Sequence, residues 1–181
     1  LELFWSDRPA VPSTPITTLD VECFGGISRL DKISWLRKWM MLEEVDGVLL
    51  TSLDEIAWLL NVRGNDIEYN PLVMSCLIVR QDYVKWFVRK GTFGSYDPDT
   101  EDSFAELKMD GVDVEDYDAV YFTLSDINPG ASWKLFADVA TLNHHICSYV
   151  QESCPGTSFV FGKSPVILEK AVKTRSEQDN L

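Results

Sequence analysis

The sequence lacks most of the short patterns that mark a catalytic or nucleotide-binding site. Its 181 residues contain no GxGxxG, GxxxxGK[ST] or GxSxG pattern. A Gly-rich dinucleotide site, a P-loop and a serine nucleophile elbow are therefore not indicated. Histidine is scarce: the chain has two, the adjacent His144 and His145. Neighbours on a helix point about 100° apart, so we expect one half-buried and one solvated histidine rather than a metal site.

Cysteine is also scarce, and long apolar runs are absent. The four cysteines, at positions 23, 76, 147 and 154, form no CxxC pattern, and we expect reduced thiols, as in the cytosol. No run approaches the roughly 18 apolar residues of a membrane-spanning helix. The first residues have neither the basic nor the unbroken apolar region of a signal peptide. We therefore expect a cytoplasmic protein with no membrane partner.

The chain has fewer basic residues than acidic ones. Sixteen Lys and Arg face 29 Asp and Glu, which gives a formal net charge of −13 and a pI near 4.4. Such a surface repels phosphate backbones, so we expect no nucleic-acid partner. Hydrophobic residues make up 45% of the chain and aromatic residues 12%. This composition provides enough apolar material for a folded core.

Residues 1–28 are expected to form an N-terminal arm or linker from a preceding domain. Prolines and a glycine pair at this density interrupt helix and sheet alike. The breakers are Pro9, Pro12, Pro15, Gly25 and Gly26. Three aromatic residues are expected to hold the arm against the following domain: Phe4, Trp5 and Phe24.

Residues 29–175 alternate between helical and strand patterns, which predicts one α/β domain. A helix over 29–44 starts at Ser28 and carries an apolar face, and a buried strand follows at 47–51. Ser52 and Glu55 fit a capping box for a helix over 53–60. Further strands are predicted at 73–79, 83–89, 112–114, 134–137 and 158–161. Further helices are predicted at 102–109, 117–127, 142–152 and after Ser164-Pro165. A loop is predicted at 91–100 and a turn at 128–130. Strands 73–79 and 83–89 should pair as a hairpin, and Ser176 resembles the cap of a last helix.

The segment after the helix at 53–60 is dense in polar and aromatic residues. Arg63, Asp66, Tyr69 and Asn70 lie within eight positions of one another. Such residues in a turn often line an interface or a cleft. The alternative is that Arg63 and Asp66 pair with each other and order the loop. Both interpretations stay open on the sequence.

At this segment the sequence resembles the middle domain of three-domain, cytosolic-type Xaa-Pro aminopeptidases. The shared pattern is LDEIAWL-N-RG-D--YNP, here spread over residues 53–71. Trp5-Ser6-Asp7-Arg8-Pro9 resembles the family's W-(S/T)-D-R-P segment, and Ser164-Pro165 with Lys170-Ala171-Val172-Lys173 resembles the end of that domain. The resemblance covers nearly the whole chain and is weakest over residues 91–132.

The resemblance implies a fold and a function. The fold is a creatinase/prolidase N-terminal domain, an α/β domain with a mixed six-stranded sheet flanked by helices and a topology similar to ribonuclease H. The whole enzyme removes the N-terminal residue from peptides with proline in second position. It uses two divalent metals, usually manganese, in a separate catalytic domain, and members are commonly homodimers. Residues 176–181 are then expected to be the start of that catalytic domain.

The same resemblance implies what this chain should not contain. None of the five metal ligands of the family can be placed here, so we expect no catalytic, cofactor-binding or metal-binding residue and no peptidase activity in this chain alone. Its partners should be the flanking domains of its own chain, with Xaa-Pro peptides as substrates of the whole enzyme. Arg63, Asp66, Tyr69 and Asn70 are the candidates for an interdomain or cleft-facing surface. The alternative is the protein-binding domain of a catalytically dead pseudo-peptidase.

Overall fold

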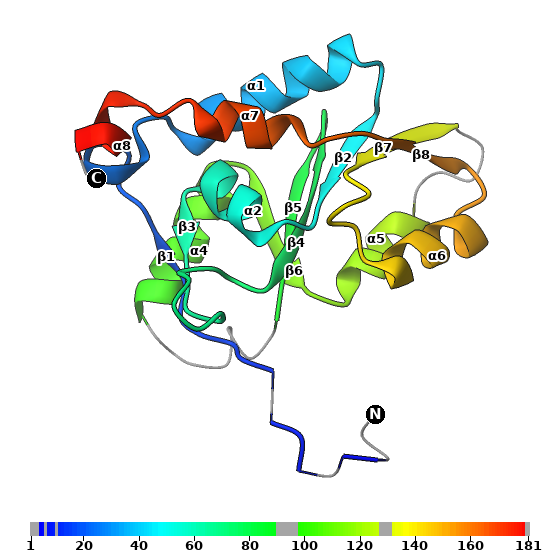
Figure 1. Cartoon of the computed structure of the whole chain (residues 1–181), viewed down its shortest axis with the longest axis horizontal. Coiled ribbons are helices and arrows are strands. Elements are labelled where there is room, and N and C mark those ends of the chain that lie inside the picture. The colour runs from blue at the N-terminus through cyan, green and yellow to red at the C-terminus, as the bar shows by residue number, and fades with distance from the viewer. Residues whose placement is uncertain (1–3, 6, 10, 90–97, 127–131, 180–181) are drawn as a thin grey trace.

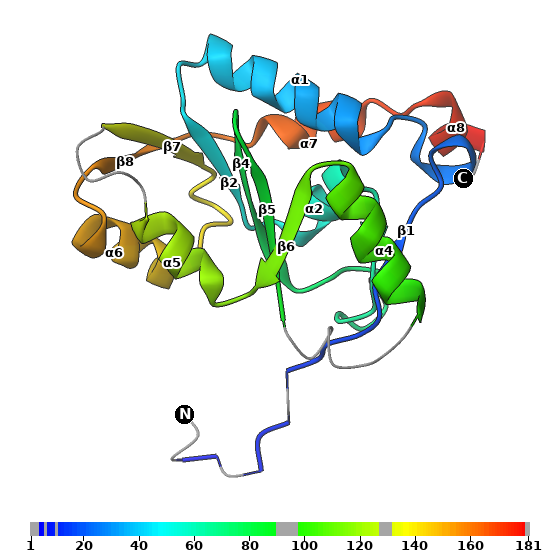
Figure 2. The same cartoon turned by 180° about the vertical axis from the view of Figure 1, so that it is seen from behind.

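A six-stranded sheet forms the centre of the chain in a computed structural model that describes residues 4–5, 7–9, 11–89, 98–126 and 132–179. Helices cover both faces of this sheet (Figures 1 and 2). The strands lie in the order β6-β5-β4-β2-β7-β8. Their bounds are β2 (Gly47–Leu50), β4 (Ser75–Arg80), β5 (Val84–Val88), β6 (Val112–Asp116), β7 (Trp133–Ala137) and β8 (Thr157–Phe161).

The sheet is mixed. β4 runs antiparallel to both β2 and β5. The pairs β2–β7, β7–β8 and β5–β6 are parallel. The predicted hairpin and the predicted mixed six-stranded α/β fold are both confirmed. The predicted turn at 128–130 and most of the predicted loop at 91–100 lie outside the described residues.

Alternate residues of the central strands enter two separate apolar cores. Val48 and Leu50 of β2 pack on one side, against α1 (Arg29–Leu42), α2 (Leu53–Leu60), α4 (Pro98–Met109) and α7 (Pro165–Ala171). Leu49 packs on the other side, against α5 (Ala119–Ser125) and α6 (His144–Ser153). Burial on both faces explains why the strands read as continuous apolar runs rather than as an alternation.

The helix α1 begins where the sequence predicts. The Ser28 hydroxyl accepts a hydrogen bond from the Asp31 amide at 3.1 Å, which satisfies an otherwise unpaired first-turn N–H. Ile33, Leu36 and Met40 are buried, whereas Leu30 in the first turn is 51% exposed. The first turn of α1 is instead buried through Arg29 and Lys32, and its buried apolar side chains start at Ile33.

The expected capping box of α2 is wrong. The Ser52 side chain caps no amide of the helix and donates instead to Asp54. The carboxylate of Glu55 is buried and accepts a hydrogen bond from the hydroxyl of Ser164, the N-cap residue of α7. Glu55 thus links two helices that are neighbours in space but distant in sequence.

The segment expected to be an arm contains ordered structure. β1 (Thr17–Thr18) pairs antiparallel with β3 (Val62–Arg63), and the π-helix η1 (Val21–Gly25) follows it. Ile16 beside β1 is fully buried. The aromatic contacts expected of Phe4 and Trp5 are wrong, because these side chains are 92% and 50% exposed on a stretch that runs away from the domain (Figure 1). The Phe24 side chain lies outside the described part of the chain.

The last helix, α8 (Arg175–Asp179), is capped by a different residue from the one expected. Its cap is Thr174 rather than Ser176. The Glu177 amide donates to Thr174 Oγ1 at 3.2 Å, while the Thr174 amide and hydroxyl donate to Glu177 Oε2 at 2.8 and 2.9 Å. This reciprocal arrangement is a capping box.

Candidate functional site

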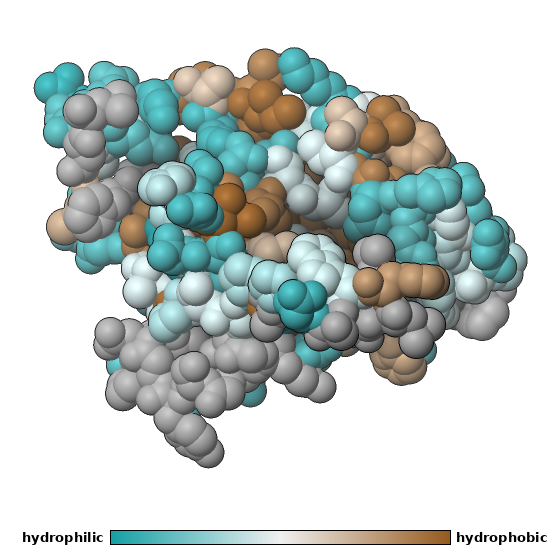
Figure 3. Space-filling view, turned by 60° about the horizontal axis from the view of Figure 1, so that its bottom comes forward, coloured by the Kyte–Doolittle hydropathy of each residue, from teal (hydrophilic) through white to brown (hydrophobic). Residues whose placement is uncertain are grey.

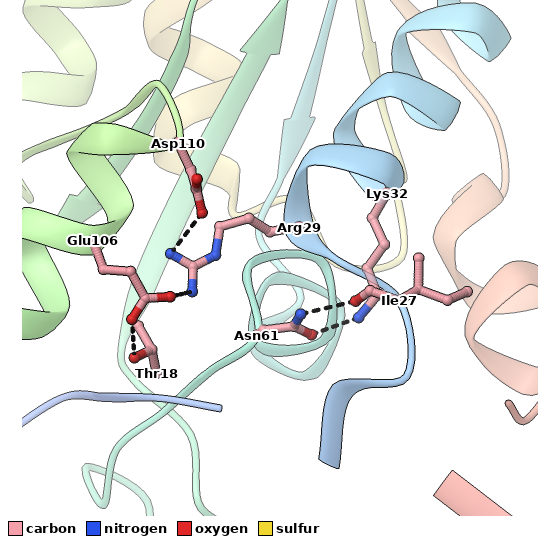
Figure 4. A network of polar contacts seen from close by, with 7 residues as sticks. All are labelled: Thr18, Ile27, Arg29, Lys32, Asn61, Glu106 and Asp110. Carbon is pink, nitrogen blue, oxygen red and sulfur yellow. Dashed lines mark hydrogen bonds and ion pairs between the residues drawn. The ribbon is translucent and has the colours of Figure 1, made fainter. Parts of the chain in front are cut away.

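The segment that begins at Asn61 is fixed at its start by a buried polar network. Asn61 ends α2 with a left-handed backbone (φ 54°), a conformation that Asn adopts more readily than most residues. Its side chain accepts from Lys32 Nζ at 2.6 Å and donates to the Ile27 carbonyl at 3.0 Å (Figure 4). Lys32 Nζ also donates to the Trp58 carbonyl at 2.7 Å. The start of the segment is thus tied to α1 and to the chain that precedes it.

A second part of the network joins β1, α1 and α4. Arg29 is 3% exposed, and its guanidinium lies 2.6 Å from Glu106 and 3.4 Å from Asp110. Glu106 also accepts from the Thr18 hydroxyl at 2.6 Å (Figure 4). No local sequence pattern could reveal these contacts, because Glu106 is 77 residues from Arg29 and 88 from Thr18.

Arg63 is half-buried and closes the end of α2. Its Nη1 donates to the Ala57 carbonyl at 3.1 Å and to its neighbour Val62 at 2.8 Å. A cation at a helix C-terminus is favoured by the partial negative charge there. Burial lowers the pKa of Arg63 and also lowers that of Lys32 to about 8, and the charge of Glu177 opposes both shifts.

Asp66 is buried and anchors the loop to the N-terminal segment. Its carboxylate accepts from the Thr14 amide at 2.8 Å, from the Thr14 hydroxyl at 2.7 Å and from the Met74 amide at 2.8 Å. The Thr14 hydroxyl in turn accepts from the Asn65 amide at 2.8 Å. Thr14 was not a candidate from the sequence, where nothing distinguishes it from the other hydroxyl residues of the arm.

Tyr69 and Asn70 lie at the exposed tip of the loop. Tyr69 is 92% exposed and has a left-handed backbone (φ 63°), which is uncommon for a bulky residue. The tip is nevertheless held, because the Asn70 amide donates to the Ile67 carbonyl at 3.0 Å and the Leu72 amide to the Asn70 carbonyl at 2.7 Å. A large side chain is therefore presented to solvent from an ordered turn.

The four predicted site residues thus divide into two pairs. Arg63 and Asp66 bind different partners inside the domain, so the hypothesis that they pair with each other is wrong. Tyr69 and Asn70 extend outward and remain available for contact. Viewed from the lower end of Figure 1, apolar side chains form several separate groups among hydrophilic ones (Figure 3). An interdomain or cleft-facing role for the four residues stays a prediction.

The residues that the structure describes do not fit a metal centre. Among them, no three His, Cys, Asp or Glu side chains are grouped so that they could hold an ion. His144 and His145 are both exposed, so the expectation of one half-buried histidine is wrong. The ring centres of His145 and Tyr121 lie 5.1 Å apart in an edge-to-face arrangement. None of the four cysteines forms a disulfide. No helix within the described ranges is long and apolar enough to cross a bilayer.

Comparison with known proteins decides the family. The family model described as Creatinase/Prolidase N-terminal domain matches residues 7–177. The chain belongs to this family. The resemblance seen in the sequence is therefore confirmed.

The curated relatives of this domain are longer proteins. The chain is 31% identical to a "Probable Xaa-Pro aminopeptidase P" of Laccaria bicolor and 32% identical to the human "Xaa-Pro aminopeptidase 2", and both alignments cover 98% of the chain but 26% of the relative. The chain thus spans about a quarter of the length of the curated relatives that it matches.

A solved structure agrees with this assignment. The X-prolyl aminopeptidase of Caenorhabditis elegans, described as a cytosolic enzyme with a di-nuclear active site, superposes with a TM-score of 0.81 at 29% identity. That match covers 98% of this chain and 28% of the other. The Xaa-Pro dipeptidase of Bacillus anthracis shares the fold, with a TM-score of 0.55 at 16% identity.

Proposed function

We propose that this chain is a non-catalytic domain of an Xaa-Pro aminopeptidase, an enzyme that removes the N-terminal residue from peptides with proline in second position. The observation that carries the proposal is the coverage: 98% of the chain matches curated Xaa-Pro aminopeptidases, but it spans 26% of their length. The two divalent metals, manganese by our proposal, belong to the remaining length of the parent protein. Bound there, they would supply a Lewis acid that activates water and polarises the scissile carbonyl, and no described residue of this chain would hold them.

The partners of this domain, in the same proposal, are the flanking domains of its own chain. We place the parent in the cytoplasm and assign it a homodimeric state. Tyr69 and Asn70 are proposed to face the catalytic part or the cleft beside it, and Arg63 and Asp66 hold the loop that presents them. Support comes from the contrast within the loop: its base is anchored by hydrogen bonds to the buried residue Asp66, while the side chain of Tyr69 is 92% exposed.

The first experiment compares this chain with the full-length parent protein in an assay of N-terminal residue release from an Xaa-Pro peptide. With added Mn²⁺ the parent should release the residue, and a chelator should abolish the release. The isolated 181-residue chain should release none under either condition. Metal-dependent release by the isolated chain would overturn the proposal, and an inactive parent would instead favour a pseudo-peptidase.

The proposed surface is tested with Tyr69→Ala in the active parent. We expect kcat/KM to fall about tenfold, since an exposed aromatic anchor of an interface typically contributes that much. The same substitution should change the free energy of unfolding of the isolated chain by no more than about 0.5 kcal/mol. Phe122→Ala is the control, because Phe122 is 70% exposed on α5 at another part of the surface. Equal effects of the two substitutions on kcat/KM would contradict the assignment of this surface.

A further inference from the structure

The helix α8 lies against the π-helix η1, so the last described residues of the domain meet a segment near its start (Figures 1 and 2). None of the five residues of α8 is buried. The link between α7 and α8 is also open, and Val172 within it is 74% exposed. A short helix with no buried side chain has little apolar packing to hold it. Its position must depend on a few specific contacts.

One of these contacts is between Thr174 and Gly26. Gly26 ends η1 with a left-handed backbone (φ +62°), and its amide donates to the Val21 carbonyl at 2.8 Å. A Cβ atom at Gly26 would lie 2.2 Å from Thr174 Oγ1 and 2.8 Å from Thr174 Cβ. The close approach therefore requires glycine on one side and places the N-cap of α8 directly against η1.

The two sides of this contact are each held by hydrogen bonds of their own, and the charges of Glu177 and Lys32 attract each other across it. On one side, the Asp20 side chain accepts from the Cys23 amide at 2.8 Å, and Ile27 is tied to Asn61. On the other, the capping box between Thr174 and Glu177 orders α8. Partial burial of Glu177 raises its pKa, but the hydrogen bonds from Thr174 and the charges of Lys173 and Lys32 outweigh this effect and lower it. Because α8 has no buried side chain of its own, loss of the contact with η1 should also loosen the capping box and expose the amides that donate to Thr174.

We propose that residues 172–179 form a latch, which closes on η1 through Thr174 and Gly26 and opens without unfolding of the sheet. When the latch is closed, it fixes the direction of the chain after α8 relative to the body of the domain. When it is open, the exposed link at Val172 lets that direction change. In the parent enzyme of the proposed function, the latch controls the placement of the following domain. That consequence rests on the proposed function, but the latch itself does not.

Hydrogen exchange followed by mass spectrometry on the 181-residue chain tests the latch. The reporters are the amides of Glu177 and Gln178, which donate to Thr174. In the wild type they should exchange at least about 100-fold faster than amides of β4, because they open locally. Gly26→Ala should accelerate them about tenfold further and leave β4 unchanged.

Gly111→Ala is the matched control for backbone strain. Gly111 also has a left-handed backbone (φ +77°), but nothing lies within 4 Å of a Cβ atom placed there. It should therefore leave the exchange of α8 unchanged. Exchange of α8 at the rate of β4, or equal rates in wild type and Gly26→Ala, would overturn the latch.

A second pair of variants decides the question if Gly26→Ala fails to fold. Glu177→Ala removes one half of the capping box, whereas Asp179→Ala on the same helix breaks an exposed 3.3 Å pair with Arg175. Glu177→Ala should accelerate exchange on the other side of the contact, at the Gly26 amide of η1, about tenfold, and Asp179→Ala less than about twofold. Equal acceleration by the two variants contradicts the proposal. Because the measurement uses no peptidase activity, failure of the latch and failure of the proposed function are distinguishable.

Discussion

Lys32 and Glu55 are charged residues that the domain buries, at 3% and 1% exposure. Burial of a charge is tolerated where hydrogen bonds replace water. Lys32 has the carbonyl of Trp58 and the side chain of Asn61, and its ammonium group lies 4.3 Å from the centre of the Trp58 ring. Glu55 has the hydroxyl of Ser164. Burial raises the pKa of Glu55 and lowers that of Lys32 to about 8.

The lowered pKa of Lys32 predicts a pH dependence of stability. Between about pH 8 and the ordinary lysine pKa of 10.5, the unfolded chain binds more protons at this site than the folded chain does. The free energy of unfolding should therefore rise at this site as the pH increases from about 8 to 10.5. The gain is fully present above pH 10.5 and is lost as the pH falls through 8. Relative to Lys32→Met, the wild type should gain about 2 kcal/mol in free energy of unfolding between pH 8 and pH 10.

Urea denaturation of both proteins across this pH range measures that gain. The difference between the two proteins is the informative quantity, because groups with a raised pKa such as Cys76 and Tyr83 are present in both and their contributions cancel. A difference that stays constant between pH 8 and pH 10 would show that the Lys32 ammonium is not desolvated in the folded domain.

At the scale of elements, two serines occupy the N-cap positions of α2 and α7, and they act differently. Ser164 accepts from the Val166 amide at 3.3 Å and donates to the buried Glu55, whereas Ser52 makes no capping bond. Ser164→Ala should therefore lower the free energy of unfolding by about 2 kcal/mol, through loss of the cap and of a partner for a buried carboxylate. Ser52→Ala should lower it by less than about 0.5 kcal/mol. Thermal or urea unfolding compares the two, and similar losses would contradict the assignment of the cap.

The elements were predictable where their cause is local. The strands predicted at 47–51 and 73–79 correspond to β2 and β4, which are buried on both faces, and that burial appears directly in the sequence as apolar runs. The pairing of β1 with β3 was not predictable, because it joins two-residue strands through Thr17–Arg63 and Thr18–Val62. Elements this short carry no periodicity.

The same contrast explains the outcome at the candidate site. The dense polar residues at 63–70 form a loop at the predicted position, but partners such as Thr14 for Asp66 lie 52 residues away, and the role of the loop stays a prediction. The Ser52–Glu55 pattern likewise suggested a local partner for Glu55, while the actual partner, Ser164, is 109 residues away. Which residues hold the loop and which face outward is decided by tertiary contacts, and the sequence does not display those.

At the scale of the whole molecule, the N-terminal segment up to residue 19 contributes to the core of the domain. Ile16 is fully buried, Thr14 supplies two of the three hydrogen bonds to Asp66, and Thr18 binds Glu106. The described residues before Ala10, in contrast, are exposed. The physical boundary of the fold therefore lies between these two stretches, within the segment whose prolines suggested a linker.

Two N-terminal deletions locate this boundary. Deletion of residues 1–19 should lower the free energy of unfolding by about 4 kcal/mol, because it removes one fully buried isoleucine and leaves the carboxylate of Asp66 without most of its donors. Deletion of residues 1–9 should change it by less than about 0.5 kcal/mol, since the described side chains it removes are exposed. Urea midpoints of the two deletions and of the whole chain provide the comparison. If both deletions leave the urea midpoint unchanged, residues 11–19 are not part of the cooperative unit. If both deletions lower the midpoint equally, the boundary lies nearer the N-terminus than the buried contacts indicate.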